Sequence, residues 1–78
     1  MKVTITKPDS TLFDGEAKLI QLPGTGGLFE ILNNHAPIIS SLASGTIRLV
    51  LNDDSEQTFP IRGGVVKGQQ NQILLLVQ

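Results

Sequence analysis

The chain has 78 residues, six basic and seven acidic side chains, and a formal net charge of −1. It contains one histidine, three phenylalanines and no cysteine, tyrosine or tryptophan. This composition excludes disulfides, thiolate metal sites and multi-histidine metal sites, and it supplies neither the basic stripe nor the stacking aromatic residues that nucleic-acid binding needs. We therefore expect one domain, residues 1–78, with no metal, no cofactor and no nucleic-acid partner.

Alternation of apolar and polar residues predicts strands along the whole chain. At the N-terminus Met1, Val3 and Ile5 point to one face, which is the period of a half-buried strand and not the pattern of a signal peptide. Asp14-Gly15 is a hairpin dipeptide, so we expect it to end the second strand. No apolar run approaches the roughly 20 residues of a membrane span, and we expect no direct membrane insertion. The predicted strands are residues 1–6, 11–13, 16–22, 28–32, 38–42, 46–51, 56–61, 65–67 and 72–77.

Residues 22–39 hold three of the eight glycines, two of the four prolines and the only histidine. Gly24, Gly26 and Gly27 predict a tight loop between two strands, because glycine reaches backbone angles that other residues adopt only at a cost. The Asn-Asn-His-Ala-Pro run of residues 33–37 predicts a second turn. The rest of the chain is organised around this segment.

The C-terminal part predicts an edge strand and an unusually apolar last strand. Pro60 cannot donate a hydrogen bond to a neighbouring strand, so its strand should lie at a sheet edge or a bulge. Residues 73–77 are apolar on both faces, which indicates either a central strand covered on both sides, as we expect, or a strand with a partner protein on its outer face. The sequence therefore predicts an all-β fold, a flattened sandwich or barrel of about ten short, mostly antiparallel strands.

Four sequence patterns that could indicate a particular function have simpler explanations. The glycine loop does not predict a phosphate site, because such a site needs a following helix N-terminus and here a strand follows. Residues 22–26 spell a cell-wall sorting motif, but an ordinary domain follows them. His35 has serines nearby but no nucleophile elbow, so we do not expect catalysis. Asp53, Asp54 and Glu56 are better explained as a solvated turn than as a cation site.

Five ordered motifs resemble the epsilon subunit of F-type ATP synthases. They are Leu-Phe-Asp-Gly-Glu at 12–16, Leu-Pro-Gly-Thr-Gly-Gly-Leu-Phe at 22–29, His-Ala-Pro-Ile-Ile at 35–39, Ser-Gly-Thr-Ile-Arg at 44–48 and Ile-Arg-Gly-Gly-Val-Val at 61–66. The resemblance implies a noncatalytic β-sandwich of the central stalk that binds the gamma subunit and turns with it on the c ring. It would thereby help to couple proton translocation to ATP synthesis.

The resemblance also implies two sets of contact residues and a location. We expect no nucleotide on this chain, and a peripheral position on the cytoplasmic face of a bacterial membrane through the complex, with the stromal face of a thylakoid left open. The expected contacts with the polar loops of the c ring are Thr25, Gly26, Gly27, Leu28, Phe29 and Glu30. The expected contacts with the gamma subunit are Lys7, His35, Ala36, Pro37 and Ser40.

Two departures from the family pattern bear on these expectations. Glu30 replaces a usual glycine, and Asn33-Asn34 replaces Pro-Gly, although Asn34 can still adopt a left-handed turn. Most members continue into a C-terminal helical hairpin, whereas this sequence ends at Gln78, and we expect a natural short form over a truncated one. The alternative function is a stand-alone β-sandwich that binds a protein or a ligand through the apolar face near residues 73–77.

Overall fold

The computed structural model describes all 78 residues, and every regular element in it is a β-strand. The all-β prediction is confirmed, with nine strands where about ten were expected. The chain has no helix long and apolar enough to cross a membrane. The strands are β1 (Lys2–Lys7), β2 (Ser10–Glu16), β3 (Leu19–Gly24), β4 (Gly27–Leu32), β5 (Ile38–Leu42), β6 (Gly45–Val50), β7 (Glu56–Ile61), β8 (Gly64–Gln69) and β9 (Gln72–Val77).

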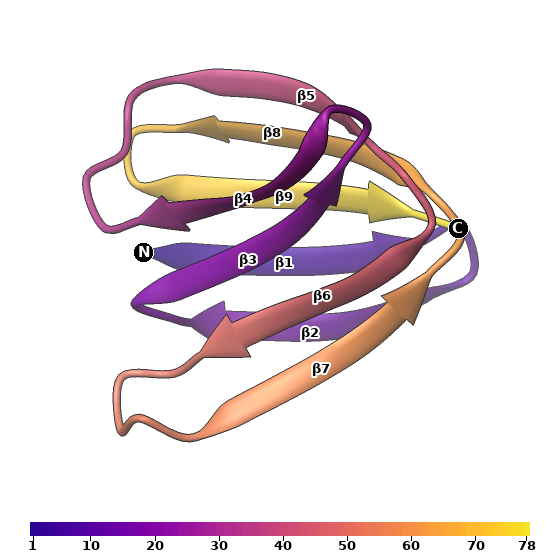
Figure 1. Ribbon diagram of the computed structural model, residues 1–78. Coiled ribbons are helices and arrows are strands. Elements are labelled where there is room, and N and C mark those ends of the chain that lie inside the picture. Colours follow the sequence, from indigo (N-terminus) through magenta and orange to yellow (C-terminus); the bar gives the residue numbers. More distant parts are fainter.

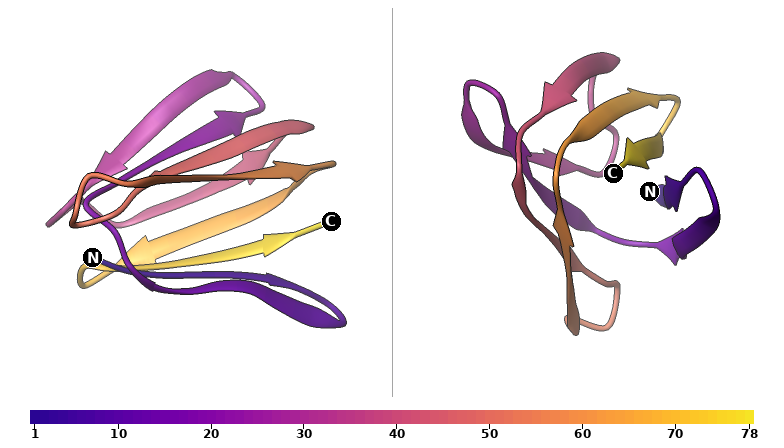
Figure 2. Two further views of the ribbon diagram at one scale, coloured as in Figure 1. Left: turned by 90° about the horizontal axis from the view of Figure 1, so that it is seen from below. Right: turned by 90° about the vertical axis from the view of Figure 1, so that its right-hand side faces the viewer.

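The strands form one continuous hydrogen-bonded sheet that curls until its two halves face each other (Figures 1 and 2). The order is β2-β1-β9-β8-β5-β3-β6-β7, and β4 pairs with β3 outside this path. All pairings are antiparallel except the parallel pair β1–β9. β5 pairs with β8 over five positions and meets β3 at one, where Leu42 lies opposite Gly24, so it joins the two layers.

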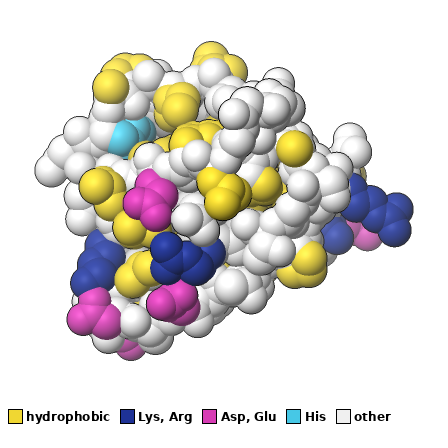
Figure 3. Space-filling view, in the orientation of Figure 1, with side chains coloured by type: hydrophobic (Ala, Val, Ile, Leu, Met, Phe, Trp, Pro, Cys, Tyr) yellow, Lys and Arg dark blue, Asp and Glu magenta, His cyan; other side chains and the backbone are white.

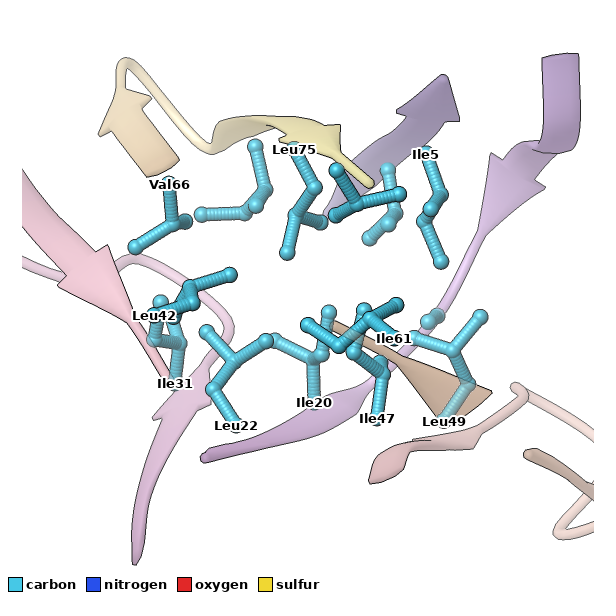
Figure 4. Close-up of a cluster of buried hydrophobic side chains, with 14 of the residues drawn as sticks. Ile5, Ile20, Leu22, Ile31, Leu42, Ile47, Leu49, Ile61, Val66 and Leu75 are labelled. Atoms are coloured by element: carbon cyan, nitrogen blue, oxygen red, sulfur yellow. The ribbon is translucent and has the colours of Figure 1, made fainter. Parts of the chain in front are cut away.

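The core lies between the two layers, where alternate residues of each strand point inward. Side chains of Ile5, Val66 and Leu75 from one layer face Ile20, Leu22 and others from the opposite layer (Figure 4). Fully burying one such side chain stabilises the fold by about 1.5–3 kcal/mol. The buried core residues are Met1, Val3, Ile5, Ala17, Ile20, Leu22, Ile31, Leu42, Ile47, Leu49, Ile61, Val66, Ile73, Leu75 and Val77.

The predicted turn at Asp14-Gly15 is wrong. β2 runs through both residues to Glu16, and the break before β3 lies at residues 17–18 instead. Gly15 lies opposite Val3, in the ladder that pairs β2 with β1. Ending β2 earlier would leave backbone groups at the start of β1 without partners, and this cost outweighs the local preference of an Asp-Gly dipeptide for a turn.

The last strand is central in the sheet, between β1 and β8, but it is not covered on both sides. Ile73, Leu75 and Val77 are buried, whereas Leu74 is 39% and Leu76 53% exposed. The preferred expectation of an internal strand is therefore wrong, because the curled sheet supplies only two layers and no element covers the outer face of β9. This outer face is apolar and open.

Pro60 lies in β7, which is the strand at one end of the sheet, so the edge prediction is confirmed. The opposite end of the sheet is β2. The rings of Phe13 in β2 and Phe59 in β7 meet edge to face with centroids 6.1 Å apart. Edge-to-face aromatic pairs contribute about 0.5–1.5 kcal/mol beyond their buried area, so this pair helps to hold the two ends of the sheet together.

The turn between β6 and β7 gives a prediction about pH. The carboxylate of Asp53 accepts hydrogen bonds from the Ser55 hydroxyl and, at 3.0 Å, from the Ser55 amide, and these bonds lower the Asp53 pKa below 3.8. Both bonds favour the ionised form, so their stabilising effect is present above pH 3.8 and is lost as the pH falls through the lowered value. We expect Ser55→Ala to raise the Asp53 pKa toward 3.8 in an NMR titration. An unchanged pKa would contradict the hydroxyl contact.

Candidate functional site

The glycine loop is the tip of the β3–β4 hairpin. Gly24 lies opposite Gly27, so Thr25 and Gly26 form a two-residue tip, shorter than the loop expected from the sequence. Gly27 has a φ of 127°, a conformation that favours glycine. The Thr25 amide donates to the Ser41 carbonyl at 3.3 Å and ties the tip to β5. The tip is therefore exposed but held by its own backbone.

Side chains of β4 alternate between solvent and core beyond the tip. Leu28 is 70% exposed, and Glu30 is also exposed. Phe29 points inward and packs against the core. A side chain at Gly24 would have its Cβ 2.7 Å from the Phe29 ring, so Gly24 is needed to admit this ring. Of the six residues expected to contact a partner here, Phe29 supports the hairpin from inside and the other five are exposed.

Glu30 points away from the tip, onto the outer face of β3 and β6. Its Oε2 lies 3.6 Å from an Arg48 guanidinium nitrogen and accepts from the Gln21 amide at 3.4 Å. Arg48 also pairs with Glu56 at 3.2 Å. Acidic and basic side chains lie next to one another on this face (Figure 3). Exposed pairs of this kind contribute about 0–1 kcal/mol each, so the group orients Glu30 more than it stabilises the fold.

The second predicted turn, at residues 33–37, is held by a hydrogen bond at Asn34 and by the packing of His35. Asn34 has a φ of 62°, which confirms the left-handed turn, and its amide donates to the Asn71 side chain at 2.7 Å. The His35 Nδ1 lies 2.9 Å from the Ala36 carbonyl, while its Nε2 is buried without a hydrogen-bond partner. The ring covers Gly68, where an added Cβ would lie 3.0 Å from the His35 Cε1. His35 therefore fixes the turn by packing.

The five residues expected to contact the gamma subunit do not form one patch. Ala36 and Pro37 are exposed beside His35, in a groove of about 350 Å³ that Glu30 also lines. Lys7 lies at the other end of the sandwich. His35 packs against Gly68, which lies opposite Ile73 near the start of β9, whereas Lys7 follows Thr6, which lies opposite Leu76 near the end of β9. Ser40 lies opposite the buried Val66 and so points to the inner side of β5.

An open apolar surface lies where the sequence offered it only as the alternative contact site, near residues 73–77. We call it the β8–β9 outer face, comprising the outward residues Ile39, Val65, Lys67, Leu74 and Leu76. Its four apolar members are exposed by 74% (Ile39), 42% (Val65), 39% (Leu74) and 53% (Leu76). The signal for it was the apolar character of residues 73–77 on both faces, for which an internal strand was preferred and a partner protein on the outer face was the alternative.

Exposed apolar side chains thus gather on one sheet face of a closely packed sandwich, and Leu28 adds one beside the hairpin tip. Such a surface is typical of a small β-sandwich domain that contacts other proteins. No group of three or more His, Cys, Asp or Glu residues is placed to hold a metal ion. A family model described as "ATP synthase, Delta/Epsilon chain, beta-sandwich domain" matches residues 1–78, and the chain belongs to this family.

Individual relatives agree with this assignment. The ATP synthase epsilon chain of Chlorobium limicola is 40% identical over 99% of this chain and 88% of its own length. That of Rickettsia typhi is 34% identical over 100% of this chain and 73% of its own length. The resemblance noted in the sequence is thereby confirmed. As a family member, the chain is a noncatalytic central-stalk subunit of an ATP synthase, associated with the membrane through that complex.

Solved structures agree on the fold alone. A chain in the Euglena gracilis mitochondrial ATP synthase has a TM-score of 0.90 at 18% identity, over 96% of this chain and 48% of its own length. A chain in the Tetrahymena thermophila mitochondrial ATP synthase has a TM-score of 0.83 at 20% identity, over 100% of this chain and 63% of its own length. This chain therefore spans about half of the Euglena chain that it matches.

Proposed function

We propose that this domain joins the gamma subunit to the c ring, so that the three turn together while proton translocation drives ATP synthesis elsewhere in the complex. The observation that supports this proposal is the presence of two separate exposed surfaces, the β3–β4 tip and the β8–β9 outer face, on one closely packed body. A body with a dense apolar core transmits force with little internal deformation. Two partners can then be held at a fixed distance.

The tip would contact the polar loops of the c ring through Thr25, Gly26, Gly27 and Leu28. Gly26 has no atom within 4 Å of the position of an added Cβ, so nothing in the chain covers it. A partner backbone can approach closely where there is no side chain. Phe29 supports this contact from the core, and Glu30 reaches it only from the side, since its carboxylate lies near Arg48.

The gamma subunit would contact the rim and outer side of the β5–β8–β9–β1 layer. Ala36 and Pro37 are exposed at one end of this layer, with His35 as their packed support, and Lys7 lies at the other end. A partner that spans the layer touches both ends. Ser40 is half-buried on the inner side of β5, so it would contribute to this contact only at the rim of the layer.

Within a cell, we infer a peripheral position on the cytoplasmic face of a bacterial membrane, with the stromal face of a thylakoid as the plastid equivalent. The chain would be held there by its partners. The family assignment supports this location, because the relatives it matches are ATP synthase chains of bacteria.

Co-expression with the gamma subunit from the same organism tests the proposal. We expect the two chains to elute together from a size-exclusion column at micromolar concentration in low salt. Elution as two separate peaks would contradict the proposed function.

We also expect no nucleotide-dependent change in this chain. Its glycine loop leads into a strand, so it lacks the helix N-terminus whose amides and dipole hold phosphates in nucleotide-binding loops. Adding millimolar ATP should leave its amide NMR spectrum unchanged at every residue. Saturable shifts confined to one group of amides would reveal a nucleotide site and overturn this prediction.

A further inference from the structure

We propose that the β8–β9 outer face binds an apolar surface of a partner protein, and that a carboxylate on this partner surface pairs with Lys67. The inference rests on the proposed function, in which the partner is the gamma subunit, and it adds the chemistry by which that partner is recognised. The strands that carry the face lie side by side in the layer formed by β5, β8, β9 and β1 (Figure 1).

The register gathers the apolar side chains around Lys67. Ile39 in β5 lies directly opposite Lys67, which in turn lies opposite Leu74 in β9. Two residues along, Val65 lies opposite Leu76. Directly opposed residues of an antiparallel pair point to the same side of the sheet, so these five side chains share the outer face. The ammonium group therefore has apolar neighbours on both adjacent strands.

Lys67 has no carboxylate of its own chain within ion-pair distance, unlike Lys2, which borders the same hollow. Lys2 pairs with Asp14 at 3.0 Å. Both lysines line a shallow hollow of about 330 Å³. The other residues of this hollow are Thr4, Gln69, Gln72, Ile73 and Leu74, none of which is acidic. The hollow thus offers one uncompensated positive charge, hydrogen-bonding side chains and an apolar wall.

These features define what can cover the face. Removing the Lys67 ammonium from water without a counter-charge would cost more free energy than the adjoining apolar contacts contribute. A purely apolar surface is therefore a poor fit. A carboxylate in the hollow compensates the charge while the apolar rim packs around it. A second copy of this chain is also a poor fit, because a two-fold axis through the face would bring Lys67 against Lys67.

The test uses the complex with the gamma subunit and a zero-length carbodiimide, which joins a lysine amine to an adjacent carboxylate as an amide with loss of water. We expect mass spectrometry to find Lys67 joined to an aspartate or glutamate of the gamma subunit. Lys67→Arg should keep the binding and lose the cross-link, because a guanidinium keeps the charge but does not form the amide. Lys67→Glu should raise the Kd for the gamma subunit by about 30-fold or more.

Lys18→Glu is the matched control, with the same change of charge at an exposed lysine that pairs with Asp54, away from the β8–β9 outer face. It should change the Kd by less than about threefold. Circular dichroism spectra equal to that of the unsubstituted chain would show that each variant folds.

The outcomes separate this inference from the proposed function. If the unsubstituted chain does not bind the gamma subunit, the proposed function fails and the inference fails with it. If it binds and Lys67→Glu binds equally well, only the inference fails. A dimer of the isolated chain that Leu76→Ser dissociates would assign the face to a second copy, which also overturns the inference.

Discussion

Replacing Gly64 by alanine is expected to lower the free energy of unfolding by about 3 kcal/mol or more. Gly64 has a φ of 154°, and a Cβ there would lie 2.3 Å from the Leu76 carbonyl oxygen and 2.9 Å from the Val77 Cα. Both are backbone atoms of β9 held by the ladder in which Gly64 lies opposite Val77. Relief of the clash therefore requires β8 and β9 to separate at this end. Urea unfolding followed by circular dichroism measures the loss.

Gly26→Ala is the matched control for this substitution. Gly26 lies at the hairpin tip, has no atom within 4 Å of an added Cβ and does not have a positive φ. Its replacement should change the free energy of unfolding by no more than about 0.5 kcal/mol. Equal urea midpoints for the two variants would show that the close approach of β8 and β9 at Gly64 is incorrect.

A single acidic substitution beside the tip is expected to uncouple the assembled enzyme. Leu28 is 70% exposed next to the tip, where we propose contact with the c ring. Leu28→Glu would place a carboxylate in that contact, and loss of one central contact residue commonly costs more than 1 kcal/mol. We expect ATP synthesis driven by a proton gradient in reconstituted vesicles to fall by about tenfold.

Thr58→Glu provides the comparison away from both proposed contacts. Thr58 is exposed in β7, the strand at one end of the sheet. A glutamate there should leave ATP synthesis within about twofold of normal, as expected of a surface change outside a contact. A tenfold fall in both variants, or in neither, would argue against a contact centred on the tip.

Much of the fold could be predicted because local pattern and tertiary structure agree. Alternation at Val3 and Ile5 places them in the core, and Pro60 marks an edge strand. Asp14-Gly15 could not be placed correctly, because its turn preference competes with a ladder to β1 that the local sequence does not reveal. The exposure of one face of residues 73–77 could not be predicted either, because the number of layers that cover a strand is a property of the whole sheet.

The candidate site follows the same division. The glycine spacing around Gly26 predicts a tight loop, and the structure has a tight hairpin there. The direction of Glu30 depends on Arg48, a residue of another strand, so no local pattern could supply it. In the sequence, the β8–β9 outer face was visible only as the unusually apolar residues 73–77. Lys67 belongs to another strand, and only the pairing of β8 with β9 brings it beside Leu74.

The central claim is that the Thr25-Gly26 tip sits on the c ring, and site-directed cross-linking in the assembled ATP synthase tests it most directly. The chain has no cysteine, so Thr25→Cys gives one attachment point for a short photoreactive cross-linker. Asn52→Cys, at the exposed β6–β7 turn, is the control. We expect Thr25→Cys, and not Asn52→Cys, to form a covalent product with the c subunit. A c-subunit product from Asn52→Cys alone, or from neither variant, would contradict the account.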